Sequence, residues 1–422
     1  MSGVDAKFDT TYEWQAVLLL FLGFGLVGLD RWIIAPLFPT MMRDLHLTYQ
    51  DLGYAVGALS LGWGTFSALM GNLSDRIGRR RILIPALLVF SCMAGVTGMV
   101  SGVAMLVAIR TVMGGTEGAF LSTSVALTGE ASHPKRRGFN QGIQLSGFSL
   151  FGLALGPIIA TQLLAVVPSW RWVFFCVSIP GFILAVFVYR VIREPPHLQR
   201  SAAAGPRAPS LPWTDLFRSR NVVLSMLGMM CGMSCIFVLG AFIPNYLVDY
   251  LHMSAVQMGF VTSGLGVGGF LGGIAMLALS DLIGRRSTAI LCFTGAAVLL
   301  YCFIRTGVEP LMLFLLLGGV SFFGNGVLSL LTGPVATEAV PAQLTSSAIG
   351  IASGTGEIFG GGIGPMIAGY IAQHYGIQNV VVFSLAGLLL GVVISAAFIE
   401  TAPRRTAVLR KAKAKERQPS SP

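Results

Sequence analysis

The chain has 422 residues, of which 54% are hydrophobic and only 11% charged, and its mean hydropathy is +0.76. Globular domains carry roughly 25% charged residues, so this composition excludes an ordinary soluble protein and indicates a polytopic membrane protein. The formal net charge is +10. No basic segment is interleaved with aromatic residues, so we expect no nucleic-acid partner.

Apolar runs of about 20 residues, separated by short polar loops, predict twelve transmembrane helices. The long runs rich in Leu and Gly lack the alternation of a barrel strand, so they favour an all-α membrane protein. The predicted spans are residues 15–40, 51–73, 82–101, 103–128, 140–165, 170–190, 222–248, 256–278, 288–305, 309–331, 345–371 and 379–399.

The basic residues lie predominantly on one side of this predicted topology. Apart from Arg31, Arg43, Arg110, Arg171 and Arg305, every Lys and Arg falls on the side that holds both termini. Cytoplasmic loops carry the excess of Lys and Arg, so both termini are predicted to be cytoplasmic and the number of spans to be even. We expect a multi-pass plasma membrane protein, in a bacterium the inner membrane.

A segment rich in Ser, Ala, Pro and Arg divides the chain into two halves of six spans. The predicted organisation is an N-terminal six-helix bundle at residues 1–190 and a cytoplasmic linker at residues 191–220. A C-terminal six-helix bundle at residues 221–400 and a basic cytoplasmic tail at residues 401–422 follow.

The two halves repeat weakly. Residues 74–80 (SDRIGRR) match residues 280–286 (SDLIGRR), and residues 156–160 (GPIIA) match residues 364–368 (GPMIA). Two matches at nearly the same offset predict an internal duplication. Many transporters place their site between two such pseudo-symmetric bundles.

Four charged residues lie within the first and fourth predicted spans, namely Asp30, Arg31, Arg110 and Glu117. Arg110 and Glu117 are seven residues apart, so they share one helical face at about 10 Å along the axis. A charge at bilayer depth costs roughly 2.5–3.5 kcal/mol, which indicates a substrate or ion path. The alternative is a fixed ion-pair network that ties the two spans together.

The balance of two acids and two arginines suggests a coupling mechanism. Burial and a neighbouring arginine act in opposite directions on the ionisation of an acid, so Asp30 and Glu117 are predicted to exchange the coupling proton. Protonating either acid frees an arginine, and a guanidinium binds a carboxylate through two parallel hydrogen bonds. Arg31 and Arg110 are therefore predicted to bind an anionic substrate, with Asp30 directed toward Arg110.

Polar residues at mid-membrane depth extend this prediction into the second half. Glu357, in the eleventh span, is predicted to be a second proton-coupling or polar substrate group, and the alternative is a hydrogen-bonded core residue. Asn325 occupies the repeat position of Glu117. The predicted cavity-lining side chains, each of which packing alone also explains, are Tyr54, Trp63, Gln144 and Asn325.

Residues 71–81 (GNLSDRIGRRR) resemble the signature loop between the second and third helices of the major facilitator superfamily. The second copy departs from the pattern at Leu277, which stands in place of glycine. The resemblance implies a twelve-helix fold and a conformational latch at this loop; a purely topogenic role for its arginines is the alternative. The implied latch residues are Gly71, Asp75, Arg76, Gly78, Arg79, Asp281 and Arg285.

Within that superfamily, Asp30-Arg31 and the stretch from Arg110 to Gly118 resemble the anion:cation symporter family. This resemblance implies proton-coupled symport of a small organic anion, a carboxylate, by alternating access. Spinster-type transporters share the same charge layout. A spinster-like exporter of lipids or amphipathic drugs is therefore the alternative.

Motifs of other classes are absent from the sequence. There is no HExxH, GxSxG or Walker A pattern, and the two GxGxxG matches lie inside spans, so neither an enzyme nor an ATP-driven pump is expected. The cysteines lie in apolar spans, which gives little support to a metal site. We expect no cofactor beyond the coupling proton, and as partners only the anion and the bilayer around a monomer.

Overall fold

The structure, a computed structural model, describes residues 9–133, 136–194, 213–341 and 344–401, and every regular element in these ranges is helical. The first half contains α1 (Thr10–Trp32), α2 (Ile34–Leu45), α3 (Tyr49–Ile77), α4 (Arg79–Thr97), α5 (Val103–Ala131), α6 (Arg137–Phe148), η1 (Ser149–Leu155), α7 (Gly156–Val166) and α8 (Trp170–Val191).

The second half repeats this order after the short helix η2 (Trp213–Arg218). It contains α10 (Arg220–Asn245), η3 (Tyr246–Tyr250), α11 (Ala255–Ile283), α12 (Arg285–Arg305), α13 (Pro310–Leu330), η4 (Leu331–Val335), α14 (Thr345–Thr355), η6 (Gly356–Ile363), α15 (Gly364–Tyr375) and α16 (Gln378–Ala396).

These elements form twelve membrane-crossing segments. Ten helices of the described part are long and apolar enough to cross a membrane. The 29-residue α3 and the continuous run of α14, η6 and α15 complete the twelve. The predicted fold class is confirmed, and the predicted boundaries differ from the observed ones by a few residues.

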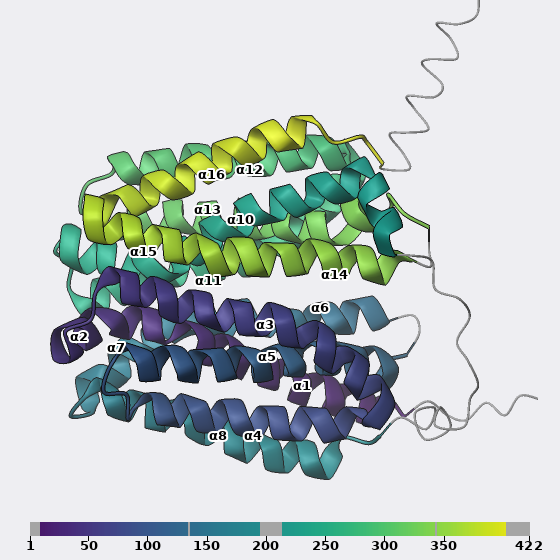
Figure 1. The fold of residues 1–422 in the computed structure, drawn as a ribbon, viewed down its shortest axis with the longest axis horizontal. Helices are drawn as coiled ribbons and strands as arrows, with labels where there is room; N and C mark the ends of the chain where they lie inside the picture. The colour runs from purple at the N-terminus through teal and green to yellow at the C-terminus, as the bar shows by residue number, and fades with distance from the viewer. Residues whose placement is uncertain (1–8, 134–135, 195–212, 342–343, 402–422) are drawn as a thin grey trace, which may run out of the picture.

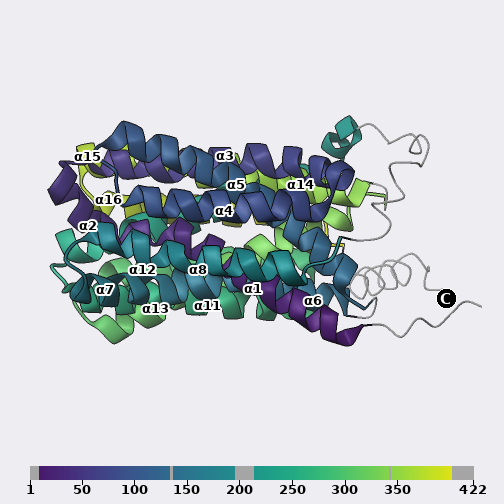
Figure 2. The same ribbon diagram turned by 90° about the horizontal axis from the view of Figure 1, so that it is seen from below.

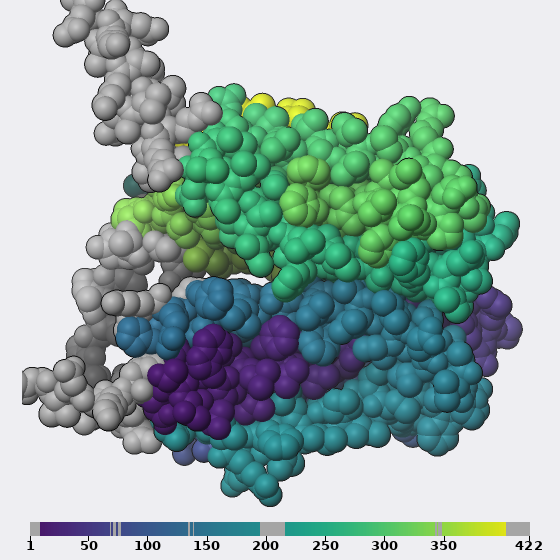
Figure 3. All heavy atoms as spheres, turned by 180° about the vertical axis from the view of Figure 1, so that it is seen from behind, coloured from purple at the N-terminus to yellow at the C-terminus, as the bar shows by residue number. Residues whose placement is uncertain are grey.

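The two bundles lie side by side, with α1–α8 in one and α10–α16 in the other (Figure 1). A seam between them follows the long axis of the molecule (Figure 3). The elements α2, α7 and α15 lie at one end and the starts of α6 and α14 at the other (Figure 2). We call the end that holds Arg79 and Arg285 the basic end.

The contacts between the bundles are strongest away from the basic end. There α2 packs on α10, α3 on α15, and α7 on α11. The Tyr49 hydroxyl donates to Oδ2 of Asp249 at 2.9 Å, across the seam. A Cβ at Gly53 would lie 2.5 Å from the carbonyl oxygen of Pro365, so glycine is needed for this close helix contact.

At the basic end, each bundle holds its own arginine in the same way. Arg79 donates to Ser74 and to both carboxylate oxygens of Glu130, while Glu194 accepts from its backbone N–H. Arg285 repeats every one of these contacts in the second bundle, with the partners Ser280, Glu338 and Glu400.

These arginine contacts therefore stay within one bundle in the part of the chain that the structure describes. Arg285 also pairs with Asp281 of its own bundle at 2.7 Å. The implied latch between the bundles stays a prediction. Its members Gly71, Asp75 and Arg76 lie outside the residues whose side chains are described.

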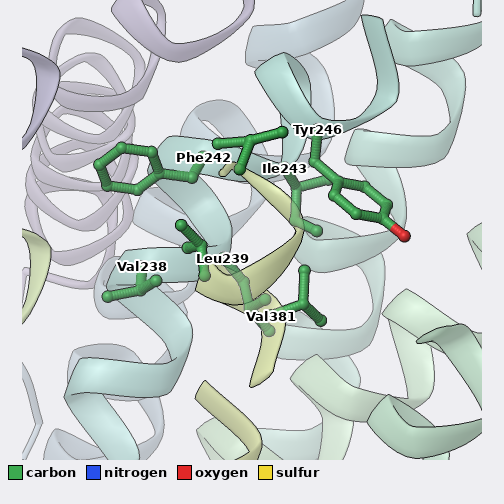
Figure 4. Close-up of a pocket in the computed structure, with 8 residues that line it drawn as sticks. Val238, Leu239, Phe242, Ile243, Tyr246 and Val381 are labelled. Atoms are coloured by element: carbon green, nitrogen blue, oxygen red, sulfur yellow. The ribbon is translucent and has the colours of Figure 1, made fainter. Parts of the chain in front are cut away.

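A small apolar pocket lies inside the second bundle, between α10 and α16 (Figure 4). It has no charged lining residue, so it offers nothing to an anion or a proton. Its lining consists of Val238, Leu239, Phe242, Ile243, Tyr246, Ile377, Val380 and Val381.

Candidate functional site

Arg31 lies in the last turn of α1 and reaches across the seam between the bundles. Its Nη2 donates to Oγ of Ser60 at 2.7 Å and to Oε2 of Glu357, in the other bundle, at 3.0 Å. The side chain of Arg31 is 3% exposed and that of Glu357 is 12% exposed. A charge pair so little exposed to water is stable only while both partners are present, because removal of one leaves a buried, unpaired charge.

Aromatic rings enclose the Arg31 guanidinium. The ring centroids of Trp63 and Phe237 lie 4.5 Å and 4.6 Å from its central carbon, and that of Phe148 lies 5.9 Å away. Trp63 and Phe148 belong to the first bundle and Phe237 to the second. The rings stabilise the cation by their negative faces, and both bundles contribute to this stabilisation.

Arg110 is buried and contacts the backbone of the same turn. Its Nη1 donates to the carbonyl oxygens of Asp30 and Arg31, each at 3.2 Å. The helix is interrupted at Ile33, between α1 and α2, so carbonyls of its last turn need other donors. A cation there also matches the negative end of the helix dipole. Arg110 therefore fixes the backbone that carries Arg31.

Two carboxylates complete the cluster. Asp30 and Glu117 are 3% and 0% exposed, and both interact electrostatically with Arg110. Within the described residues, Oδ1 of Asp30 and both carboxylate oxygens of Glu117 have no hydrogen-bond partner. Buried polar atoms without partners are costly, and in transporters such groups mark ion paths.

Comparison with known proteins identifies the family. The model of the family described as the Major Facilitator Superfamily matches residues 20–279 and 225–422. The chain belongs to the major facilitator superfamily. Members of this family are transporters, which supports the prediction that the chain is not an enzyme.

Several curated members are similar along most of their length. A probable 4-methylmuconolactone transporter of Cupriavidus pinatubonensis is 28% identical, over 85% of this chain and 83% of its own. The hexuronate transporter of Bacillus subtilis is 27% identical, over 89% and 90%. A bacterial homologue of the lysosomal transporter Spinster, solved inward-facing and occupied, is 17% identical with a TM-score of 0.74 over 91% and 96%, which shows the fold alone.

The predicted site residues of this facilitator separate into two groups. The cluster brings together Asp30, Arg31, Arg110, Glu117 and Glu357, as far as the described contacts show. The described hydrogen bonds of Tyr54, Gln144 and Asn325 go to residues outside this cluster.

Inside the first bundle, Gln144 accepts a hydrogen bond from Thr128 and donates one to Ser124. In the second bundle, Asn325 donates to Ser321. Tyr54 is 40% exposed and accepts from the neighbouring Gln50. Their assignment as substrate contacts stays a prediction.

Sequence reasoning missed three neighbours of Arg31: Ser60, Phe148 and Phe237. Phenylalanines are frequent in apolar spans, so no sequence signal marks Phe148 and Phe237. It also missed Glu13, which is fully buried near the basic end and accepts hydrogen bonds from Arg136, Asn140 and the backbone of His133. Glu13 precedes the first predicted span, in a stretch of polar residues, so no sequence signal marked it.

Glu357 lies in a π-helical turn, which is wider than an α-helical one. The π-helices η1 and η6 occupy equivalent positions in the two bundles, and each is followed by Gly-Pro. Proline has no backbone N–H to pair with the preceding turn, so this turn opens. In η6 the wider turn holds Glu357 opposite Arg31.

Proposed function

We propose that this transporter carries a small organic anion together with a proton, by alternating access between the bundles. The observation that carries the proposal is the buried ion pair between Arg31 and Glu357, which joins the two bundles at 3.0 Å. A substrate carboxylate offers Arg31 the same chemistry as Glu357 does. The relatives named as transporters of a hexuronate and of a muconolactone support this substrate class.

The charge count of the cluster supports proton coupling. Three acids, Asp30, Glu117 and Glu357, share the site with two arginines, Arg31 and Arg110. With every group ionised the cluster carries one excess negative charge, and one proton neutralises it. If an anion takes the place of Glu357 at Arg31, the displaced carboxylate is left buried, and protonation removes that cost.

The arrangement of contacts supports alternating access. The bundles are packed together away from the basic end, whereas the ion pairs described at the basic end stay within one bundle. The lipid or drug exporter is less well supported, because a dry cluster of five ionisable groups does not suit an apolar cargo.

Proton flux into proteoliposomes tests the proposal. Vesicles that hold a pH-sensitive dye should acidify inside faster than protein-free vesicles when benzoate, glucuronate or galactonate is added outside, because the protein carries the anion with a proton; the protein-free vesicles account for benzoic acid that crosses the bilayer unaided. The Glu117→Gln variant should lose proton-driven accumulation and keep anion counterflow. The control Glu309→Gln changes an exposed glutamate in the loop before α13 and should leave both unchanged.

Three results would contradict this proposal. One is the absence of acidification with every acid, and another is outward movement of lipid only. The third is unchanged accumulation by the Glu117→Gln variant, which would remove that residue from the proton path.

A further inference from the structure

We propose that the substrate is a monocarboxylate with a flat, aromatic or conjugated body, held edge-on at Arg31 between the rings of Trp63 and Phe237. This inference rests on the proposed function and narrows its substrate class. It follows from which parts of Arg31 are covered and which remain open.

The aromatic contacts of Arg31 leave the edge of its planar guanidinium group for a ligand. Trp63 and Phe237 lie at 4.5 Å and 4.6 Å from the guanidinium carbon, and the edge is where the N–H groups point. One edge nitrogen, Nη2, already donates to Ser60 and Glu357, while Nη1 has no partner within the described residues. A carboxylate that displaces Glu357 can therefore occupy both nitrogens.

The space at this edge is narrow. A Cβ added at Gly361 would lie 3.0 Å from the Phe237 ring and 3.2 Å from Oε2 of Glu357. The Phe237 ring and the backbone of η6 are thus the walls beside the Glu357 carboxylate, itself a flat group. A body that continues in the carboxylate plane fits these walls better than a puckered ring does.

The surrounding side chains offer few hydrogen bonds to a polyhydroxylated body. Trp32 packs against Phe237 with ring centroids 5.3 Å apart, and its buried Nε1 is a single donor without a partner in the described part of the chain. The amides of Gln144 and Asn325 are held within their own bundles. A sugar acid would leave several hydroxyls unsatisfied, whereas an aromatic acid gains contact with the rings.

Binding of labelled benzoate to the purified protein in detergent tests the inference against two acids of equal charge. Cyclohexanecarboxylate has a similar size but a puckered ring, and glucuronate has a hydroxylated one. We expect benzoate to bind, and each of the other acids to compete at least about tenfold more weakly. Equal competition by either acid would overturn the inference.

The same panel separates the two proposals. If glucuronate enters with protons and benzoate does not bind, the flat substrate is wrong and proton-coupled anion transport stands. If benzoate does not bind and no acid acidifies the proteoliposomes faster than protein-free vesicles, both proposals fail.

Substitution of Phe237 provides the second arm. The Phe237→Leu variant should reduce the preference for benzoate over cyclohexanecarboxylate on the order of tenfold, and Phe237→Trp should retain it. Phe242→Leu is the control, because Phe242 lies on the same helix but lines the apolar pocket of Figure 4. An unchanged preference in the Phe237→Leu variant would contradict the assignment of this ring.

Discussion

Arg31 joins the two bundles through its side chain. It combines a carboxylate partner from one bundle, a hydroxyl partner from the other and aromatic rings from both. Lysine would keep the charge, but it has neither the planar surface for ring contact nor the fork for bidentate binding.

This difference gives a prediction at the residue scale. The Arg31→Lys variant should raise the substrate concentration for half-maximal uptake about tenfold or more, which corresponds to a loss of roughly 1.4 kcal/mol. Uptake in proteoliposomes, measured with the acid that gives the strongest acidification, checks this. Arg305→Lys at an exposed position is the control, and equal half-saturation of the two variants would count against Arg31 as the anion contact.

Sequence alone indicated which charges matter but not how they pair. Four of the cluster residues stand out as charges in apolar runs of the first bundle, and Glu357 stands out in the second. The pairing of Arg31 with Glu357 joins residues 326 positions apart, so no local spacing reveals it. Arg110, which was predicted to bind substrate, contacts two backbone carbonyls through Nη1, a contact that the spacing of the sequence does not reveal; its substrate role stays a prediction.

At the scale of elements, the turn between α3 and α4 in the first bundle has the same structure as the turn between α11 and α12 in the second. Gly78 and Gly284 have φ of 112° and 102°, a region that other residues rarely adopt. These glycines immediately precede α4 and α12, where Glu194 and Glu400 accept from the first backbone N–H groups. A carboxylate at a helix N-terminus also matches the helix dipole.

Replacing one of these glycines should therefore destabilise the protein. Gly284→Ala should cost about 1–2 kcal/mol from the left-handed backbone, and more because its Cβ would collide with the Glu400 carboxylate. Gly307→Ala is the matched control, since nothing lies within 4 Å of a Cβ there. Thermal unfolding in detergent should show a lower Tm for Gly284→Ala only, and equal Tm values would refute the strain argument.

Hydrophobic run length predicted these elements well, because each span must cover the same bilayer thickness. It did not predict the π-helices η1 and η6, since one extra residue in a turn leaves the apolar composition unchanged. The repeated Gly-Pro segments were interpreted only as a sign of internal duplication, although proline also indicates where the helical hydrogen bonding is interrupted.

At the scale of the whole molecule, the seam is closed at the end opposite the basic end. Tyr49 contributes to this closure through its hydroxyl contact with Asp249 and its backbone contact with Gln373. Asp249 also accepts from Asn245, which further fixes the carboxylate. The hydroxyl contact is removed without loss of the ring by the Tyr49→Phe substitution.

This substitution should shift the conformational equilibrium toward separation at that end. Spin labels at Met99 and Val308, exposed positions on the two bundles, should show a larger population at long distance in Tyr49→Phe. The labels require Cys92 and Cys302, both exposed, to be replaced by serine. The exposed Tyr375→Phe is the control, and identical distance distributions would show that the hydroxyl contributes nothing to closure.

The pairing of Arg31 with Glu357 has a consequence for the empty carrier under the proposed mechanism. Ionised Glu357 takes the place of the substrate carboxylate at Arg31. The protein without substrate therefore keeps Arg31 neutralised and can change back to its starting conformation. Once Glu357 takes a proton without an anion arriving, the cluster is neutral overall, but Arg31 loses the carboxylate that accepts its hydrogen bond, and a buried cation without this partner makes the state costly to reorient. The protein would thereby conduct few protons without substrate when the substrate is scarce.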